Sequence, residues 1–295
     1  MSYGTERFFK ELAKATEGEN LNDQEAMQER MDKFTKEYFE TMDKKDRPLD
    51  AFDYLEMAED AANGKEAIRY AKKALELDSY LLDAELIIAE EKSYSAEEFE
   101  KQLKAIIKKG ETQLLEQGIS KEENEGDFYG LHETRPYMRM RKEYADLLIS
   151  QGKFRLSISE IEDIIRLNES DNLGMRYMLM ALYSFFEDEE KALALYKKYE
   201  EDSAFMLLPL IALYYKKEDD KQMRMYIRKL KRSNPDVLKA LKLFMDEDGR
   251  EEIEDIAYST TYRPASMEEV VLALTQSAFL YVPMNDFMDK LYREF

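Results

Sequence analysis

The sequence contains no cysteine and no tryptophan, and its 295 residues include only one histidine, ten glycines and six prolines. Without cysteine the chain cannot form disulfides, use a thiolate nucleophile or bind a metal through sulfur. One histidine is too few for the usual zinc ligand sets. The scarcity of turn-forming residues argues against a sandwich or barrel of many short strands. We therefore expect neither a metal site nor a fold built of strands.

Long hydrophobic segments are also missing. The longest apolar run, from Phe205 to Tyr215, is interrupted by Pro209 and is shorter than the roughly 20 residues that span a membrane. Residues 1–7 lack the apolar stretch of a signal peptide. The 64 acidic and 44 basic side chains give a net charge of −20, which disfavours binding to nucleic acid or anionic lipid. These features predict a cytoplasmic protein, monomeric or weakly dimeric, without nucleic-acid or membrane partners.

The residues that dominate the composition, Glu, Lys, Leu, Ala and Met, are strong helix formers. Together with the lack of turn formers they predict an all-α fold. The clearest structural unit spans residues 51–78, where a turn at Gly64 precedes Ala67, Ala71 and Ala74. This spacing by four and then three, with small residues, is typical of the second helix of a tetratricopeptide repeat, because small residues let two helices approach closely.

Further copies of this pattern recur along the chain. Ser157, Ala192 and Met223 occupy the same position in three tandem units, at intervals close to the 34-residue period. Residues 82–110 form a weaker copy. We therefore predict a tetratricopeptide-like solenoid of about five repeats over 48–264, with an inserted loop at 118–137. An irregular helical bundle is the alternative, since any amphipathic helix repeats its apolar residues in this way.

The ends of the chain are predicted to cap the solenoid. Residues 1–47 form a helical cap, with helices near 6–16 and 23–42. Residues 265–295 supply C-terminal capping helices. The first of these opens with a capping box at Ser266 and Glu269 and continues to about Tyr281, and a short helix follows from Asn285. Capping is expected because the open face of a terminal repeat must be buried.

Two segments resemble a known family. Residues 126–130 (Gly-Asp-Phe-Tyr-Gly) precede 133–139 (Glu-Thr-Arg-Pro-Tyr-Met-Arg), and the later stretch 166–177 runs from Arg-Leu-Asn to Arg-Tyr. In order and spacing these segments are similar to the tetratricopeptide-like family named for the eukaryotic suppression-of-tumorigenicity protein and its bacterial relatives. The resemblance implies a helical-repeat fold and a binding role, without established catalytic residues.

The candidate binding residues are Arg135, Tyr137, Arg139, Arg176 and Tyr177. The basic side chains of the chain are concentrated in 132–142 and 216–232, which carry net charges of +3 and +5. In tetratricopeptide solenoids the first helix of each repeat lines the concave groove, and arginine binds carboxylates through two parallel hydrogen bonds. We therefore predict a protein or peptide partner with an acidic or C-terminal carboxylate group. Alternatively, these arginines pair internally with Glu133, Glu143 or Asp171.

No pattern in the sequence indicates catalysis. A nucleophile elbow, a phosphate-binding loop and a dinucleotide fingerprint are all missing, and His132 is expected in a loop or packing position. The sequence predicts a non-catalytic scaffold or adaptor that needs no cofactor. A regulator that senses a peptide or small ligand is the alternative. An active site made only of carboxylates would require close-set, buried Asp and Glu pairs in a deep pocket.

Overall fold

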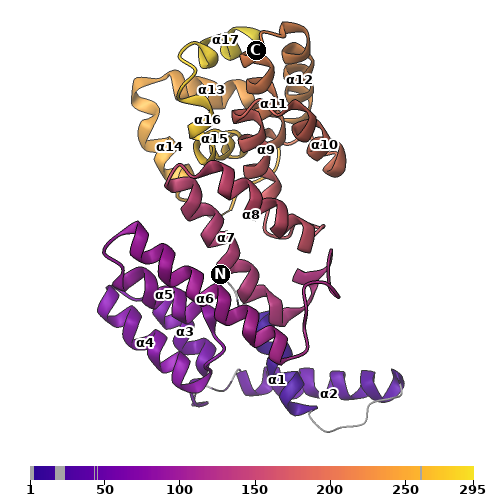
Figure 1. The fold of residues 1–295 in the computed structure, drawn as a ribbon, viewed down its shortest axis with the longest axis vertical. Coiled ribbons are helices and arrows are strands. Elements are labelled where there is room, and N and C mark those ends of the chain that lie inside the picture. Colours follow the sequence, from indigo (N-terminus) through magenta and orange to yellow (C-terminus); the bar gives the residue numbers. More distant parts are fainter. Residues whose placement is uncertain (1–2, 17–23, 43, 45, 260) are drawn as a thin grey trace. The chain divides into compact units, whose positions relative to one another are not determined.

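The computed structural model describes residues 3–16, 24–42, 44, 46–259 and 261–295. All regular elements within these residues are helices, which confirms the all-α prediction, and one isolated antiparallel bridge joins Asp127 to Asn168. None of the described helices has the length and apolar character required to cross a membrane. The chain divides into two compact units, one ending at Asn172 and one beginning at Leu173 (Figure 1).

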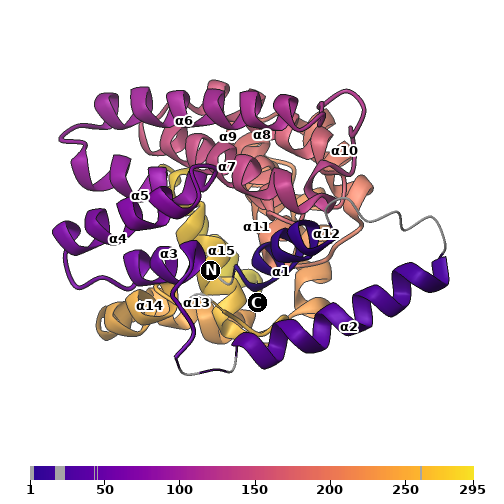
Figure 2. The same cartoon turned by 90° about the horizontal axis from the view of Figure 1, so that it is seen from below.

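The first unit begins with two helices that match predicted ones, although residue 23 of the predicted second helix lies outside the described residues. They are α1 (Gly4–Ala15) and α2 (Gln24–Met42). In Figure 2, α2 runs beside α1 and extends away from the remaining helices of this unit. Those helices are α3 (Ala51–Glu59), α4 (Gly64–Leu77), α5 (Leu82–Lys92), α6 (Ala96–Glu116), α7 (Arg135–Ser150) and α8 (Phe154–Leu167).

Helices α3 to α8 pack neighbour to neighbour. Each contacts its successor in the chain, and the alternate helices α3, α5 and α7 also contact one another in sequence. Ala67, Ala71 and Ala74 are buried, so α4 approaches its neighbours closely, as their spacing predicted. We call the surface made by α3, α5 and α7 the alternate-helix face of the first unit.

The connection between α6 and α7 contains two short 3₁₀ helices, η1 (Phe128–Gly130) and η2 (His132–Thr134). Phe128 is buried against Tyr137, and the Thr134 hydroxyl donates to the Phe128 carbonyl. The backbone N–H of Glu169 donates to the Gly126 carbonyl at 2.8 Å. These contacts tie the connection to α7 and to the end of α8.

The second unit contains nine described helices, of which the pair α13 and α14 was not predicted. The closing segment was predicted as one helix to Tyr281, but it is interrupted at Ser277, whose hydroxyl bonds to the Ala273 carbonyl. The helices are α9 (Met175–Phe185), α10 (Glu189–Tyr199), α11 (Ala204–Lys216), α12 (Asp220–Ser233), α13 (Val237–Met245), α14 (Arg250–Ala257), α15 (Met267–Gln276), α16 (Ala278–Tyr281) and α17 (Phe287–Glu294), with the 3₁₀ helix η3 (Glu247–Gly249) before α14.

In the second unit α15 packs on α11, α13 and α14, and α16 packs on α9 and α11. The predicted cap is present, since the Ser266 hydroxyl accepts the Glu269 backbone N–H. Glu269 is itself buried, and its carboxylate accepts the backbone N–H of Ala204 and of Ala265. The closing helices are therefore built into the core of this unit, along the side where α9 and α11 contact each other.

Candidate binding surface

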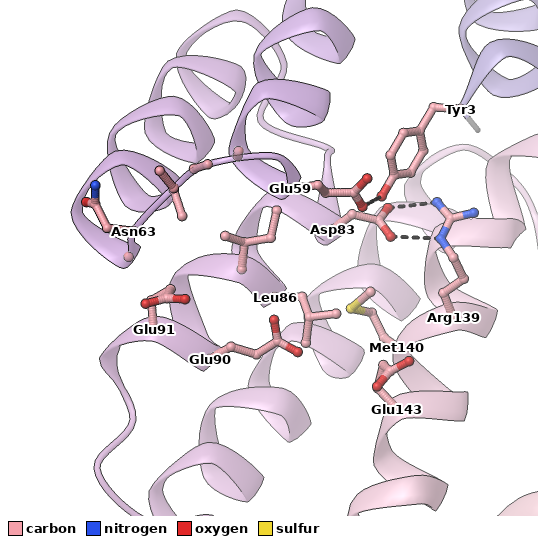
Figure 3. Close-up of a pocket in the computed structure, with 16 residues that line it drawn as sticks. Tyr3, Glu59, Asn63, Asp83, Leu86, Glu90, Glu91, Arg139, Met140 and Glu143 are labelled. Atoms are coloured by element: carbon pink, nitrogen blue, oxygen red, sulfur yellow. Dashed lines mark hydrogen bonds and ion pairs between the residues drawn. The ribbon is translucent and has the colours of Figure 1, made fainter. Parts of the chain in front are cut away.

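A pocket of about 520 Å³ opens on the alternate-helix face of the first unit (Figure 3). Its walls come from α3, from the turn leading into α4, from α5 and from α7. Apolar side chains such as Leu86 and Met140 line part of it. Its charged lining consists of five carboxylates and one guanidinium, contributed by Glu59, Asp83, Glu90, Glu91, Glu143 and Arg139.

Arg139 is the best-defined cation at this pocket. It is only 4% exposed, and its Nε and Nη2 donate to the two oxygens of Asp83, both at 2.7 Å. Its Nη1 and Nη2 also donate to the carboxylate of Glu6 on α1, at 2.5 and 2.9 Å. Burial alone would lower the pKa of Arg139, but these hydrogen bonds raise it, so the guanidinium stays charged.

Two carboxylates in the pocket, from different walls, have raised pKa values. Loss of solvation, followed by the charges of Glu143 and Glu91, raises the pKa of Glu90 on α5. Burial likewise raises the pKa of Glu143 on α7, although Lys142 opposes this shift. Glu90 is only partly withdrawn from water, so a ligand entering the pocket can reach its carboxylate. The pocket therefore offers a negative potential to a cationic group.

Arg135 and Tyr137 occupy different environments at the start of α7. Tyr137 is 2% exposed and packs against Phe128, with ring centroids 6.1 Å apart. Arg135 is partly exposed; its Nε donates to the Tyr129 carbonyl at 3.2 Å, and its guanidinium lies 5.5 Å from the centre of the Tyr129 ring. Among the described residues no carboxylate pairs with Arg135, so it keeps donors for an external acid.

Arg176 and Tyr177 lie at the start of α9 in the second unit and interact with each other. The Arg176 guanidinium stacks 4.2 Å from the Tyr177 ring centre and pairs with Glu201 at 2.9 Å. The Tyr177 hydroxyl donates to the other Glu201 oxygen at 2.8 Å. Burial and this hydrogen bond raise the Tyr177 pKa. The five candidate residues thus lie on two helices, three on α7 in the first unit and two, which contact each other, on α9 in the second.

Internal pairing, the alternative considered for the arginines, is present at Arg139 and Arg176. Arg139 pairs with Glu6 and Asp83, which are not the acids that the sequence suggested, and Arg176 pairs with Glu201. No pattern in the sequence singles out Glu6 or Asp83 as partners of Arg139. Both are acidic residues in the first turn of a helix, α1 and α5 respectively. Acidic residues are common there because they interact favourably with the helix dipole, so their presence does not indicate a distant partner.

Two further expectations concern His132 and metals. His132 lies in η2 and stacks on Phe9 of α1, with ring centroids 5.2 Å apart, which is a packing role. Loss of solvation lowers its pKa. Within the described residues there is no group of three or more His, Asp or Glu side chains that could hold a metal ion.

Comparison with known proteins does not assign the chain to a family. A search of protein-family models found no match, and a search of curated protein sequences found no significant match. The resemblance noted for residues 126–139 and 166–177 therefore stays a prediction, and function has to be argued from the geometry of the surface.

Proposed function

We propose that this chain is a non-catalytic scaffold that binds a protein or peptide through the alternate-helix face of its first unit. The observation that supports this most is the pocket on that face, whose walls come from three alternate helices and whose lining includes buried Arg139. Such a face is the groove-lining surface of a tetratricopeptide-like solenoid. The helix order of the first unit fits the predicted solenoid.

The charges of this surface favour a partner of mixed charge. The pocket lining carries five carboxylates and one arginine, which favours a basic side chain on an aliphatic stem. Arg135, which no carboxylate of the described residues pairs with, favours an acidic group of the kind expected from the sequence. The proposed partner segment therefore carries basic groups beside an acidic one. Arg176 and Tyr177 stay candidates for a separate contact in the second unit.

Selection of peptides from a displayed random library tests this proposal. The site variant is Glu90→Lys with Glu91→Lys, two exposed residues at the pocket. Its matched control, Glu122→Lys with Glu123→Lys, makes the same charge change on the exposed connection after α6.

We expect the wild-type chain to select peptides with basic residues, and the site variant to bind them about tenfold more weakly, as like-charge contacts cost on the order of 1 kcal/mol. The control variant should bind like the wild type. Equal loss of peptide affinity in both variants would show that the peptides are attracted by overall charge and not by this pocket, which would contradict the proposal. Selection of no peptide at all would also refute it. Binding of a small metabolite alone would support the ligand-sensing alternative.

A further inference from the structure

In each unit a further helix lies over the alternate helices, and these two covering helices differ in the side chains that hold them. In the second unit the covering helix α15 is apolar, and all residues from Val270 to Leu274 are buried. In the first unit the covering helix is α1, in which only Arg7 is buried. Helix α15 is therefore held by apolar burial. Helix α1 is held by a row of charged contacts, together with Tyr3, which is buried against Phe52, and Phe9, which stacks on His132. Screening and competition weaken charged contacts more readily than apolar ones.

The side chains that hold α1 lie along one helical stripe. Tyr3, Glu6, Arg7 and Lys10 follow a spacing of three, one and three, which places them on one side of the helix. Their hydroxyl and charged groups reach Glu59, Arg139, Asp50 with Asp53, and Asp78, respectively. The opposite side of α1 packs on α2, where Phe8 contacts Phe34 and Tyr38.

The residues that receive α1 have partners of their own. Asp53 also accepts both Nη groups of Arg47, each at 2.5 Å, and Arg139 also donates twice to Asp83. Burial alone would raise the Asp53 pKa, but Arg47, the Asp50 backbone and Arg7 hold it below its usual value. When α1 leaves, neither Asp53 nor Arg139 loses its last counter-charge. The free-energy cost of leaving a buried charge without an opposite charge is therefore avoided at both residues.

Helix α1 also fills its site incompletely. A groove of about 650 Å³, open to solvent, remains between α1 and the helices α5, α6 and α7, bordered on the α1 side by Glu6, Lys10, Ala13 and Lys14. The Nε of buried Arg7 has no hydrogen-bond partner among the described residues. A buried donor without a partner is unusual in a close-packed core, and the open groove leaves one side of α1 accessible.

We propose that the alternate-helix face is a docking site for a helix of a partner protein, and that α1 occupies this site as an internal mimic. The partner helix carries one carboxylate and two basic side chains on one stripe, spaced like Glu6, Arg7 and Lys10. Its carboxylate binds Arg139 on α7, and its basic groups bind Asp53 on α3 and Asp78, which lies beside this face at the end of α4. This inference rests on the proposed function, since it names the partner of the same face.

Release of α1 in the full-length chain tests the inference. The probe is a fluorescent peptide with the sequence of residues 3–16. Glu6→Lys places a positive charge against Arg139, and Lys10→Glu provides a second, milder release through repulsion from Asp78. The control, Glu11→Lys, makes the same charge change as the first variant at a residue that pairs with Lys14 within α1. Hydrogen exchange reports on α1 in each protein.

We expect both release variants to speed exchange in α1 while α5 and α7 keep their protection. They should bind the peptide about tenfold more tightly than the wild type, because the tethered α1 competes at high effective concentration. A peptide with Lys at the position of Glu6 should not bind. Unchanged exchange of α1 in both variants, loss of protection throughout the first unit, or release without tighter binding would each overturn the inference.

The two proposals can fail separately. Peptides selected from the library should compete with the α1 peptide for the released chain. If they bind without such competition, α1 is not a mimic of the partner, although the binding function stands. If no selected peptide binds either the wild-type or the released chain, the proposed function itself fails.

Discussion

Arg139 shows how burial changes the role of a charged side chain. The sequence placed it on an accessible groove, but it is 4% exposed and bonded to two carboxylates. A buried ion pair contributes little net stability, yet removing one partner leaves the other charge uncompensated. Arg135 lies one helical turn earlier, is partly exposed and has no carboxylate partner among the described residues.

Substitution of these two arginines should therefore have unequal effects on stability. We expect Arg139→Ala to lower the free energy of unfolding by about 3 kcal/mol, because Asp83 would remain buried without its counter-charge. Arg135→Ala serves as control and should change it by less than about 0.5 kcal/mol. Urea denaturation followed by circular dichroism measures both. Equal effects of the two substitutions would show that Asp83 is compensated by another group.

At the scale of elements, charged contacts link helices that are distant in sequence. The Glu100 carboxylate on α6 accepts hydrogen bonds from the Nζ of Lys104 at 2.6 Å and from the Nζ of Lys153, at the start of α8, at 2.7 Å. These hydrogen bonds lower the Glu100 pKa to about 2. A carboxyl whose pKa is lower in the folded than in the unfolded state stabilises the fold above its unfolded pKa of about 4.3, and this contribution is lost as the pH falls toward 2.

Glu100→Gln should consequently destabilise the protein at neutral pH but not in acid. We expect a loss of about 0.5 kcal/mol at pH 7, small because both lysines are partly exposed and the pairs are screened by solvent. The difference from the wild type should shrink as the pH falls below 4.3. Denaturation curves across this range measure it, with Glu116→Gln at the exposed end of α6 as control. A difference that persists unchanged at pH 3 would contradict the pKa assignment.

At the scale of the whole molecule, the chain folds as two compact units with cores of their own. Leu103 on α6 is fully buried in the first, and Leu213 on α11 is fully buried in the second. In a chain whose helices pack mainly on their neighbours, the effect of a core substitution decays with distance along the stack.

A matched pair of core substitutions tests this independence. Leu103→Ala and Leu213→Ala should each cost about 2–5 kcal/mol through lost burial and a residual cavity. We expect hydrogen exchange to rise mainly within the unit that carries the substitution. If either substitution raises exchange equally in both units, the chain unfolds as one cooperative body.

Much of the local structure could be read from the sequence. The helical periodicity, the capping box at Ser266 and the buried spacing of Ala67, Ala71 and Ala74 depend on residues only three or four positions apart. Helices α13 and α14 fall inside the predicted solenoid, but no helix was predicted for either of them. Such local patterns predict helices well because the hydrogen bonds of a helix join residues only four positions apart.

The sequence alone thus determined that the chain is all-helical and where most helices lie. Only the tertiary structure decided what covers the alternate-helix face and which partners Arg139 takes. Glu6 lies 133 residues from Arg139 in the sequence, and Asp83 lies 56 residues away. Periodicity carries no information over such separations, because a contact between distant side chains depends on the packing of all the helices between them.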